Sequence, residues 1–251
     1  RVILWINQCG NRWSDPIEID GTPSVTDVDA VRLVDLLGTG VAGVLWSGGT
    51  GSHGPQREVS FFLDFTGGTT PYLLNEMDNN MGAVTRVGYA PSTEYYLADQ
   101  EDPVMRWETV LPFPTRVVAR VEVVDAISGG KLTTEYTYHH GYWDGAEREF
   151  RGFGMVEQYD TERFVDYNAP GLHGESVDFR KSEEKARFSP PALTRTGFHQ
   201  GAVGPEHGAW RQADYSGEYW PGDPQRLEPA ETLEAYLTES GAPRRAKRDA
   251  V

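Results

Sequence analysis

The fold of this chain is decided by one aromatic and glycine-rich stretch, which reads Tyr136-Thr-Tyr-His-His-Gly-Tyr-Trp-Asp-Gly-Ala-Glu-Arg-Glu-Phe-Arg-Gly-Phe-Gly-Met-Val-Glu-Gln-Tyr-Asp160. Aromatic side chains favour the half-buried surface of a sheet, and glycine is tolerated where strands bend or bulge. Asp-Gly between two aromatic runs is a strong hairpin signal. The stretch therefore predicts two or three antiparallel strands, with residues 143–146 as a turn.

Two groups of residues in this stretch carry the structural expectation. We expect glycine to bend the sheet at Gly141, Gly145, Gly152 and Gly154, because strands bend at glycines and bulges. We expect aromatic contacts between neighbouring strands to hold the strands together. The side chains that would make these contacts are Tyr138, Tyr142, Trp143, Phe150 and Phe153.

The rest of the chain also favours strands. Residues 81–89, 117–124 and 131–138 are rich in β-branched residues and partly alternate, and residues 128–130 supply a glycine turn. Shorter strands are predicted at residues 2–6, 31–34, 44–46 and 59–65. Residues 182–187 fit a short helix or a charged edge strand, with the strand preferred, and residues 229–240 are the best candidate for a helix. The predicted fold class is mainly β and antiparallel, with little helix.

The aromatic stretch closely resembles a sequence signature of the B component of bacterial insecticidal toxin complexes (TcB, TcdB-like), a family that includes the SpvB-like virulence proteins. Residues 72–93, 112–124, 190–199 and 214–223 resemble further segments of that family, so the resemblance covers most of residues 30–225. The signature residues are Tyr138, Gly141, Tyr142, Trp143, Asp144, Gly145, Glu147, Arg148, Glu149, Phe150, Arg151, Gly152, Phe153 and Gly154.

A second resemblance concerns residues 35–43, which are similar to the calcium loop of integrin-type β-propeller repeats. Leu37, Thr39 and Gly43 stand where that loop carries acidic residues, so Asp35 is a lone remnant of the ligand set. Calcium takes about six to eight oxygen ligands. We therefore expect no metal site here, but a tight turn in which the glycines at positions 38 and 40 adopt positive φ.

The resemblance implies a domain division and a structural role. Residues 1–65 would be part of a β-propeller with a degenerate FG-GAP-like blade, residues 66–225 a β-rich, cocoon-like shell segment, and residues 226–251 a short helix with a frayed basic tail. The chain would be a fragment that spans the end of the propeller and the start of the shell. The shell would enclose a cytotoxic effector and help deliver it, without catalysis and without a cofactor.

The resemblance also implies partners and a location. The toxin-complex C component, with its enclosed effector, would close the shell, and the pore-forming A component would bind through the propeller. The protein would be secreted by a bacterium, with the cytoplasm as its location before release.

Composition excludes several classes of function. The chain has 251 residues, a formal net charge of −15 and a pI near 4.8, whereas phosphate binding needs a basic surface, so nucleic acid is not expected as a partner. No apolar run reaches the ~20 residues that span a bilayer, so direct membrane insertion is not expected either. The single cysteine, Cys9, excludes an internal disulfide and is expected to be a buried strand thiol.

Two other classes of function remain open. Glu147 and Glu149 would share one face of a strand, and paired carboxylates are the groups that hydrolyse glycosides, so a secreted carbohydrate-active enzyme or binding module is one alternative. The structural alternative for these carboxylates is a charge ladder with Arg148 and Arg151. The second functional alternative is a calcium-dependent adhesion module built on Asp35. His139 and His140 are not expected to share a metal ion, since adjacent strand residues face opposite sides.

Overall fold

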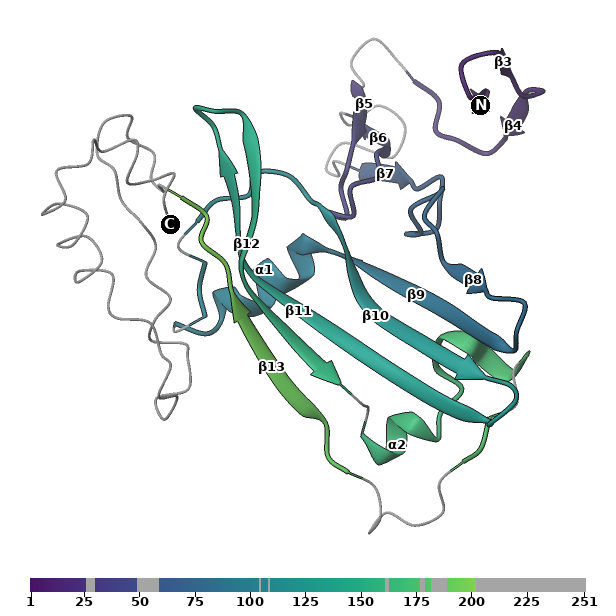
Figure 1. Ribbon diagram of the computed structural model, residues 1–251. Helices are drawn as coiled ribbons and strands as arrows, with labels where there is room; N and C mark the ends of the chain where they lie inside the picture. Colours follow the sequence, from purple (N-terminus) through teal and green to yellow (C-terminus); the bar gives the residue numbers. More distant parts are fainter. Residues whose placement is uncertain are drawn as a thin grey trace, which may run out of the picture. The chain divides into compact units, whose positions relative to one another are not determined.

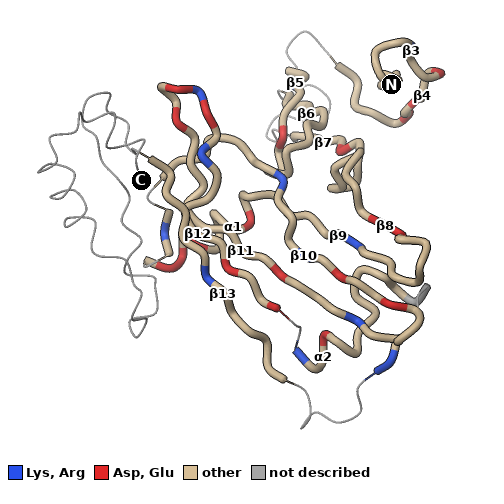
Figure 2. The backbone as a smooth tube through the Cα atoms, in the orientation of Figure 1, with Lys and Arg blue, Asp and Glu red and all other residues tan. Residues whose placement is uncertain are grey.

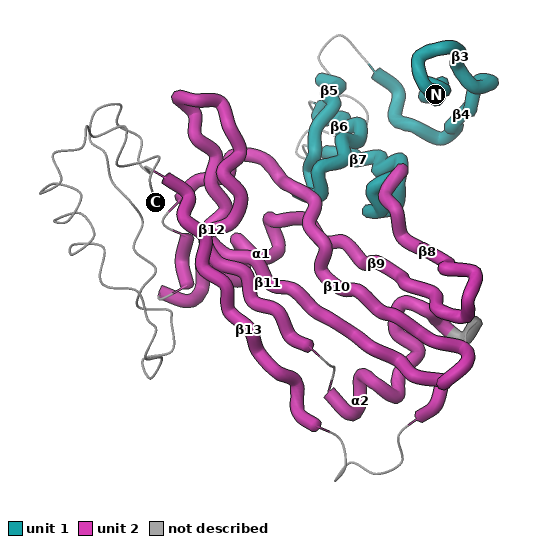
Figure 3. Tube along the Cα trace, in the orientation of Figure 1, with its two compact units in different colours: residues 1–71 teal, residues 72–251 magenta. Residues whose placement is uncertain are grey.

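The structure is a computed structural model, and it describes residues 1–25, 30–48, 59–103, 105–107, 109–160, 163–176, 179–181 and 189–201 (Figure 1). The chain divides into two compact units, Arg1–Pro71 and Tyr72–Val251 (Figure 3). The predictions for residues 182–187, 214–223 and 226–251 lie outside the described residues. Within the described residues the chain is mostly β with antiparallel pairing, which confirms the predicted fold class.

The first unit consists of short antiparallel pairs and one small sheet. Strand β1 (Val2–Leu4) pairs with β4 (Ile17–Ile19), and β2 (Asn7–Gln8) pairs with β3 (Arg12–Trp13). The small sheet has the order β5-β6-β7, with β5 (Ala30–Val34), β6 (Gly43–Gly48) and β7 (Val59–Leu63). Its central strand buries Val44 and Trp46, as expected for a strand with a neighbour on both sides. Whether the unit is part of a propeller stays a prediction.

The expectation for Cys9 was wrong. Cys9 is exposed and lies in the turn between β2 and β3. Its φ is 55°, and Gly10 follows with a φ of 80°. The side-chain oxygen of Asn7 accepts a hydrogen bond from the backbone N–H of Gly10 at 2.7 Å, which stabilises this turn. An Asn-x-x-Gly turn therefore ends the strand before the cysteine, and the thiol is exposed instead of buried in a strand.

The second unit is a single six-stranded antiparallel sheet with the order β13-β12-β11-β10-β9-β8 (Figure 1). Every strand lies beside its neighbour in sequence, so the sheet is a meander. The strands are β8 (Glu76–Asp78), β9 (Ala83–Pro91), β10 (Arg116–Asp125), β11 (Gly130–Asp144), β12 (Glu149–Asp160) and β13 (Ala192–Gly197). The glycine turn predicted at residues 128–130 connects β10 with β11. Gly129 has a φ of 68°, and the Asp125 carboxylate accepts the backbone N–H of Ile127 at 2.9 Å and the hydroxyl of Ser128 at 2.7 Å, which stabilises the turn.

One helix in this unit was not predicted. Helix α1 (Ser92–Gln100) begins directly after Pro91, the last residue of β9, and it packs against β11. Pro91 is still paired with Arg116, and the backbone N–H of Ser92 donates to the carbonyl oxygen of Thr115 at 2.8 Å, so the helix begins where the strand pair ends. Glu94 lies in the first turn of the helix, where an acidic residue is favourable. The helix has only nine residues and no clear apolar stripe, so its sequence alone did not distinguish it from a loop.

Two short helical segments lie between β12 and β13. They are α2 (Phe164–Tyr167) and the 3₁₀ helix η1 (Gly171–Ser176), and η1 contacts β9 and β10. Buried residues beneath this connection alternate along β10 and β11: Glu122 and Val124 on β10 lie opposite Thr133 and Lys131 on β11. The alternation follows from the strand period of two, so one face of the sheet is covered here.

Candidate functional site

The signature stretch forms the β11–β12 hairpin, but its turn lies two residues later than predicted. Trp143 and Asp144 are still in β11, where they pair with Phe150 and Glu149, and the turn comprises residues 145–148. The physical reason is the carboxylate of Asp144, whose Oδ1 accepts the backbone N–H groups of Ala146 at 3.0 Å and Glu147 at 3.1 Å. Aspartate commonly bonds the backbone two residues on in this way, so it closes the turn after itself.

The four signature glycines have different environments. Gly152 has a φ of 77° and lies where two residues of β12 oppose one residue of β11, which is the geometry of a glycine bulge. Gly141 lies against Trp107: a Cβ built at this position would be 2.6 Å from Cζ3 of the indole. Gly145 lies in the exposed turn and Gly154 lies inside β12, neither with a left-handed φ. Bending at Gly145 and Gly154 stays a prediction.

Aromatic rings connect the hairpin to its surroundings. The ring centroids of Tyr138 and Phe153 are 4.9 Å apart, and those of Phe150 and Phe153 are 5.8 Å apart. Further contacts reach outside the hairpin, from Tyr138 to Tyr95 of α1 at 5.6 Å and from Trp143 to Phe113 at 5.1 Å, while the Tyr142 ring is buried. Edge-to-face pairs of this kind stabilise by about 0.5–1.5 kcal/mol each beyond their buried area.

Burial also affects the ionisation of two of these tyrosines. Burial raises the pKa of Tyr95 to about 12, and burial likewise raises the pKa of Tyr138 above its ordinary value. Both hydroxyls donate hydrogen bonds to backbone carbonyl oxygens, Tyr95 to Tyr136 at 3.2 Å and Tyr138 to Val118 at 2.8 Å. The neutral phenol is the form that fits this environment, so both tyrosines act as hydrogen-bonded packing residues.

The carboxylate pair predicted for glycoside chemistry does not share a strand face. Glu147 lies in the turn, whereas Glu149 is the first residue of β12, so the expectation of one common face was wrong. Arg151 Nη2 lies 3.2 Å from Glu149 Oε2 and 3.5 Å from Asp144 Oδ2. Figure 2 shows acidic and basic residues together at this end of the hairpin. The geometry is that of a surface charge cluster around Arg151.

A buried polar cluster behind the hairpin was missed in the sequence. Asp99 of α1 accepts a hydrogen bond from Trp107 Nε1 at 2.6 Å, and its Oδ2 is 2.8 Å from His139 Nδ1. His139 and Asp99 are both buried. These residues are 40 positions apart in the chain, and no local pattern signals their pairing. The neighbouring His140 is also buried and has a φ of 56°, so the regular alternation of β11 is disturbed at this position.

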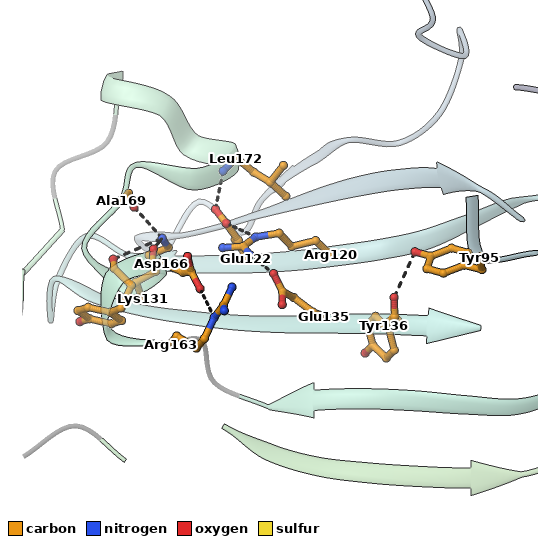
Figure 4. A network of polar contacts seen from close by, with 11 residues as sticks. Tyr95, Arg120, Glu122, Lys131, Glu135, Tyr136, Arg163, Asp166, Ala169 and Leu172 are labelled. Carbon is orange, nitrogen blue, oxygen red and sulfur yellow. Dashed lines mark hydrogen bonds and ion pairs between the residues drawn. The ribbon is translucent and has the colours of Figure 1, made fainter. Parts of the chain in front are cut away.

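A second buried polar network holds the connection between β12 and β13 on the sheet (Figure 4). Glu122, which is fully buried, accepts hydrogen bonds from Arg120 Nε at 2.5 Å and from the backbone N–H of Leu172 at 2.8 Å. The ammonium group of Lys131 donates to the carbonyl oxygens of residues 166, 167 and 169, at 3.3, 3.5 and 2.9 Å, and lies 4.9 Å from the centre of the Phe179 ring. These are charge-assisted bonds, which are stronger than neutral ones.

In the first unit, Asp35 stabilises its own loop. Its Oδ1 accepts the backbone N–H of Thr39 at 2.9 Å, and its Oδ2 accepts that of Gly40 at 2.6 Å. Gly38 and Gly40 have φ values of 65° and 80°, as predicted for a tight glycine turn.

The described part of the chain contains no group of three or more histidine, cysteine, aspartate or glutamate residues arranged to hold a metal ion. Among the described helices, none has the length and hydrophobicity needed to span a bilayer.

Comparison with known proteins places this geometry in a family. No curated protein matches the chain. Several solved structures do match. The Tc holotoxin pore of Photorhabdus luminescens, in a form with a mutation in TccC3, is 31% identical with a TM-score of 0.62, over 78% of this chain and 8% of that chain.

Two crystal structures of TcdB2–TccC3 complexes are also similar. The complex described as TcdB2–TccC3–Cdc42 is 29% identical with a TM-score of 0.61, over 79% of this chain and 9% of that chain. The TcdB2–TccC3 complex is 29% identical with a TM-score of 0.60, over the same shares of the two chains. This chain therefore spans less than a tenth of the length of the solved chains that it matches.

The family model that matches is described as the insecticide toxin TcdB middle/N-terminal region, and it covers residues 11–168. That range includes most of the first unit, α1 and the complete β11–β12 hairpin. Because the match covers more than half of the chain and agrees with the solved structures, the chain belongs to the insecticide toxin TcdB middle/N-terminal family.

Proposed function

We propose that this chain is a structural, non-catalytic part of a toxin-complex shell that encloses a cytotoxic effector and helps deliver it. The observation that carries the proposal is the six-stranded meander, whose longest hairpin is built by the family signature. Bulges and glycines curve a sheet. The hairpin has a bulge at Gly152, and the pairing of β9 with β10 shifts between Val118 and Arg120. A sheet with these features suits a curved wall.

The two edges of the sheet support a role within a larger wall. Among the described residues, β8 and β13 each pair with one strand only. An open edge presents unpaired backbone groups that other strands can use. Further strands of a longer protein would therefore continue this sheet, as a shell requires.

The proposed partners are the toxin-complex C component with its enclosed effector and, through the first unit, the pore-forming A component. Support for the C component comes from the relatives, whose solved structures are TcdB2–TccC3 complexes. Secretion from the bacterium fits the same role.

The geometry offers less support to an enzyme or a calcium module. Glu149 already lies beside Arg151, and Glu147 is in a turn, so the hairpin does not present two carboxylates on opposite sides of a substrate. Both carboxylate oxygens of Asp35 accept backbone N–H groups, which fixes the loop without an ion.

The test is co-expression of the complete natural gene product with a C component, followed by purification and limited proteolysis. We expect a stable complex in which the effector is protected from added protease. Glu149→Gln is the matched surface control and should leave complex formation and protection unchanged. A partner that fails to co-purify, with an effector that is digested as fast as when free, would contradict the shell. Loss of activity on a polysaccharide in Glu149→Gln would instead identify an enzyme.

A further inference from the structure

The buried contact between His139 and two carboxylates has a consequence for the response of the sheet to pH. His139 belongs to β11, and its ring lies between Asp99 of α1 and Glu157 of β12. The His139 side chain is 5% exposed, and those of Asp99 and Glu157 are 9% and 10% exposed. The three groups therefore interact almost without screening by water, where electrostatic effects are largest.

The hydrogen bond to Asp99 determines which ring nitrogen of His139 carries the proton. An ionised carboxylate only accepts hydrogen bonds, so Nδ1 of His139, at 2.8 Å from Asp99 Oδ2, must be the protonated nitrogen. The same Asp99 oxygen also accepts the indole N–H of Trp107 at 2.6 Å, which fixes the carboxylate. In neutral His139 the other nitrogen, Nε2, then has a lone pair and no proton.

That lone pair faces a second acceptor. Nε2 is 3.9 Å from Glu157 Oε2, and it is a buried nitrogen for which the described residues supply no hydrogen-bond partner. A lone pair and a carboxylate oxygen cannot form a hydrogen bond, so in the neutral state this buried contact is unfavourable. A proton on Nε2 would convert it into a donor–acceptor pair and an ion pair with Glu157.

The other charged groups around the site do not compensate for this missing proton. The opposite oxygen of Glu157 is 2.6 Å from Arg195 Nε of β13, so Arg195 fixes Glu157 from the far side. His140, next along β11, has its ring centroid 6.4 Å from that of His139. Among the described residues of α1, β11 and β12, the titratable groups with a contact to His139 are Asp99, His140 and Glu157, and Arg195 of β13 adds a charge behind Glu157.

We propose that His139 is a proton-operated latch: when Nε2 gains a proton, an ion pair with Glu157 ties β11 to β12 while Nδ1 holds α1 through Asp99. The side chain of protonated His139 bonds to both α1 and β12, whereas that of neutral His139 bonds to α1 only, and β11 and β12 then depend on their backbone pairing. The hairpin that carries the family signature is thus held more tightly in acid than in alkali.

A double-mutant cycle tests the latch, with His139→Gln, Glu157→Gln and the double variant in the complete natural gene product. Hydrogen–deuterium exchange measures the protection of peptides from β11 and β12, corrected for intrinsic exchange, because protection reports local opening. The measurements are made at about pH 5.5 and about pH 8, on either side of the ordinary titration of histidine. We expect coupling worth about tenfold in protection at the lower pH, and coupling near onefold at the higher pH.

The control cycle uses Arg86→Gln and Glu76→Gln, an ion pair at 2.7 Å between β9 and β8 that contains no histidine. Its coupling should not change between the two conditions. Equal coupling of His139 and Glu157 at both pH values, or none at either, would overturn the latch. If His139→Gln does not fold, the test rests on Glu157→Gln. The latch requires that this variant lose more protection at the lower pH than at the higher pH, because the loss of the Glu157–Arg195 pair contributes equally at both.

Discussion

Replacing Gly141 by alanine tests whether close packing against Trp107 defines the signature hairpin. A Cβ at this position would lie 2.6 Å from Cζ3 and 3.0 Å from Cη2 of the indole, and 3.0 Å from Leu111 Cδ2. Carbon atoms in ordinary contact are about 3.5–4.0 Å apart. The indole or the strand must therefore move by a substantial fraction of an ångström.

The surroundings of Trp107 resist that movement. Its Nε1 donates to Asp99 at 2.6 Å, and its ring makes edge contacts with Tyr96 and Phe153. Overpacking of a core costs about 1–3 kcal/mol, and alanine recovers about 0.5–1 kcal/mol of the backbone entropy that glycine loses in a strand. The net cost should be about 1–2 kcal/mol, which corresponds to a roughly 5- to 30-fold change in the local opening equilibrium.

Hydrogen–deuterium exchange of the β11 and β12 peptides in the complete gene product measures this change. The matched control is Gly145→Ala in the same hairpin, where a Cβ meets nothing within 4 Å, so protection should stay unchanged or rise slightly. Equal protection in wild type and Gly141→Ala would refute the close-packing argument. Equal loss in both variants would show that any alanine weakens the hairpin.

Three further predictions concern the second unit. Gly171→Ala should weaken the contact of the β12–β13 connection with the sheet, because Gly171 has a φ of 57° and a Cβ would lie 2.6 Å from Glu122 Oε2. Faster hydrogen–deuterium exchange of η1 than in wild type would support this, and unchanged exchange would contradict it. Lys131→Met removes the charged donor to three carbonyl oxygens of the β12–β13 connection, and a hydrogen bond to a charged group contributes about 1.5–3 kcal/mol. The connection should therefore open more often, and trypsin should cleave after Arg163 and Arg180 faster than in wild type. Because the pKa of Tyr95 is raised to about 12 from an ordinary value near 10, the stabilisation by its neutral form is complete below about pH 10 and is lost as pH rises through about 12. Tyr95→Phe should therefore reduce the loss of protection of β11 in that range, and an identical alkaline profile would contradict this.

Local sequence patterns were sufficient to predict the strands and several of the turns. Strand-forming residues and glycine turns have a local period and a local conformational cause, so the strands from residue 81 to residue 138 and the glycine loop beside Asp35 could be predicted from neighbouring residues alone. The hairpin itself was predicted, but its turn was shifted by two residues, because the capping of the turn by the Asp144 carboxylate depends on side-chain geometry. The prediction that Cys9 is buried was wrong for a similar reason. It relied on the average burial of free cysteines, whereas a local turn leaves this residue exposed.

Contacts between residues that are far apart in the chain could be seen only in the folded structure. Asp99 reaches His139 over 40 positions, and Glu122 reaches the backbone of Leu172 over 50 positions. Both contacts depend on the register of the sheet and on where α1 and η1 lie against it. No periodicity along the chain encodes such a pairing, because it arises when separately formed strands come together and each buried charge must find a partner. The tight contact of Gly141 with Trp107 arises in the same way. The sequence shows a glycine at this position, but only the folded structure shows that the absent Cβ lets the indole ring approach the strand.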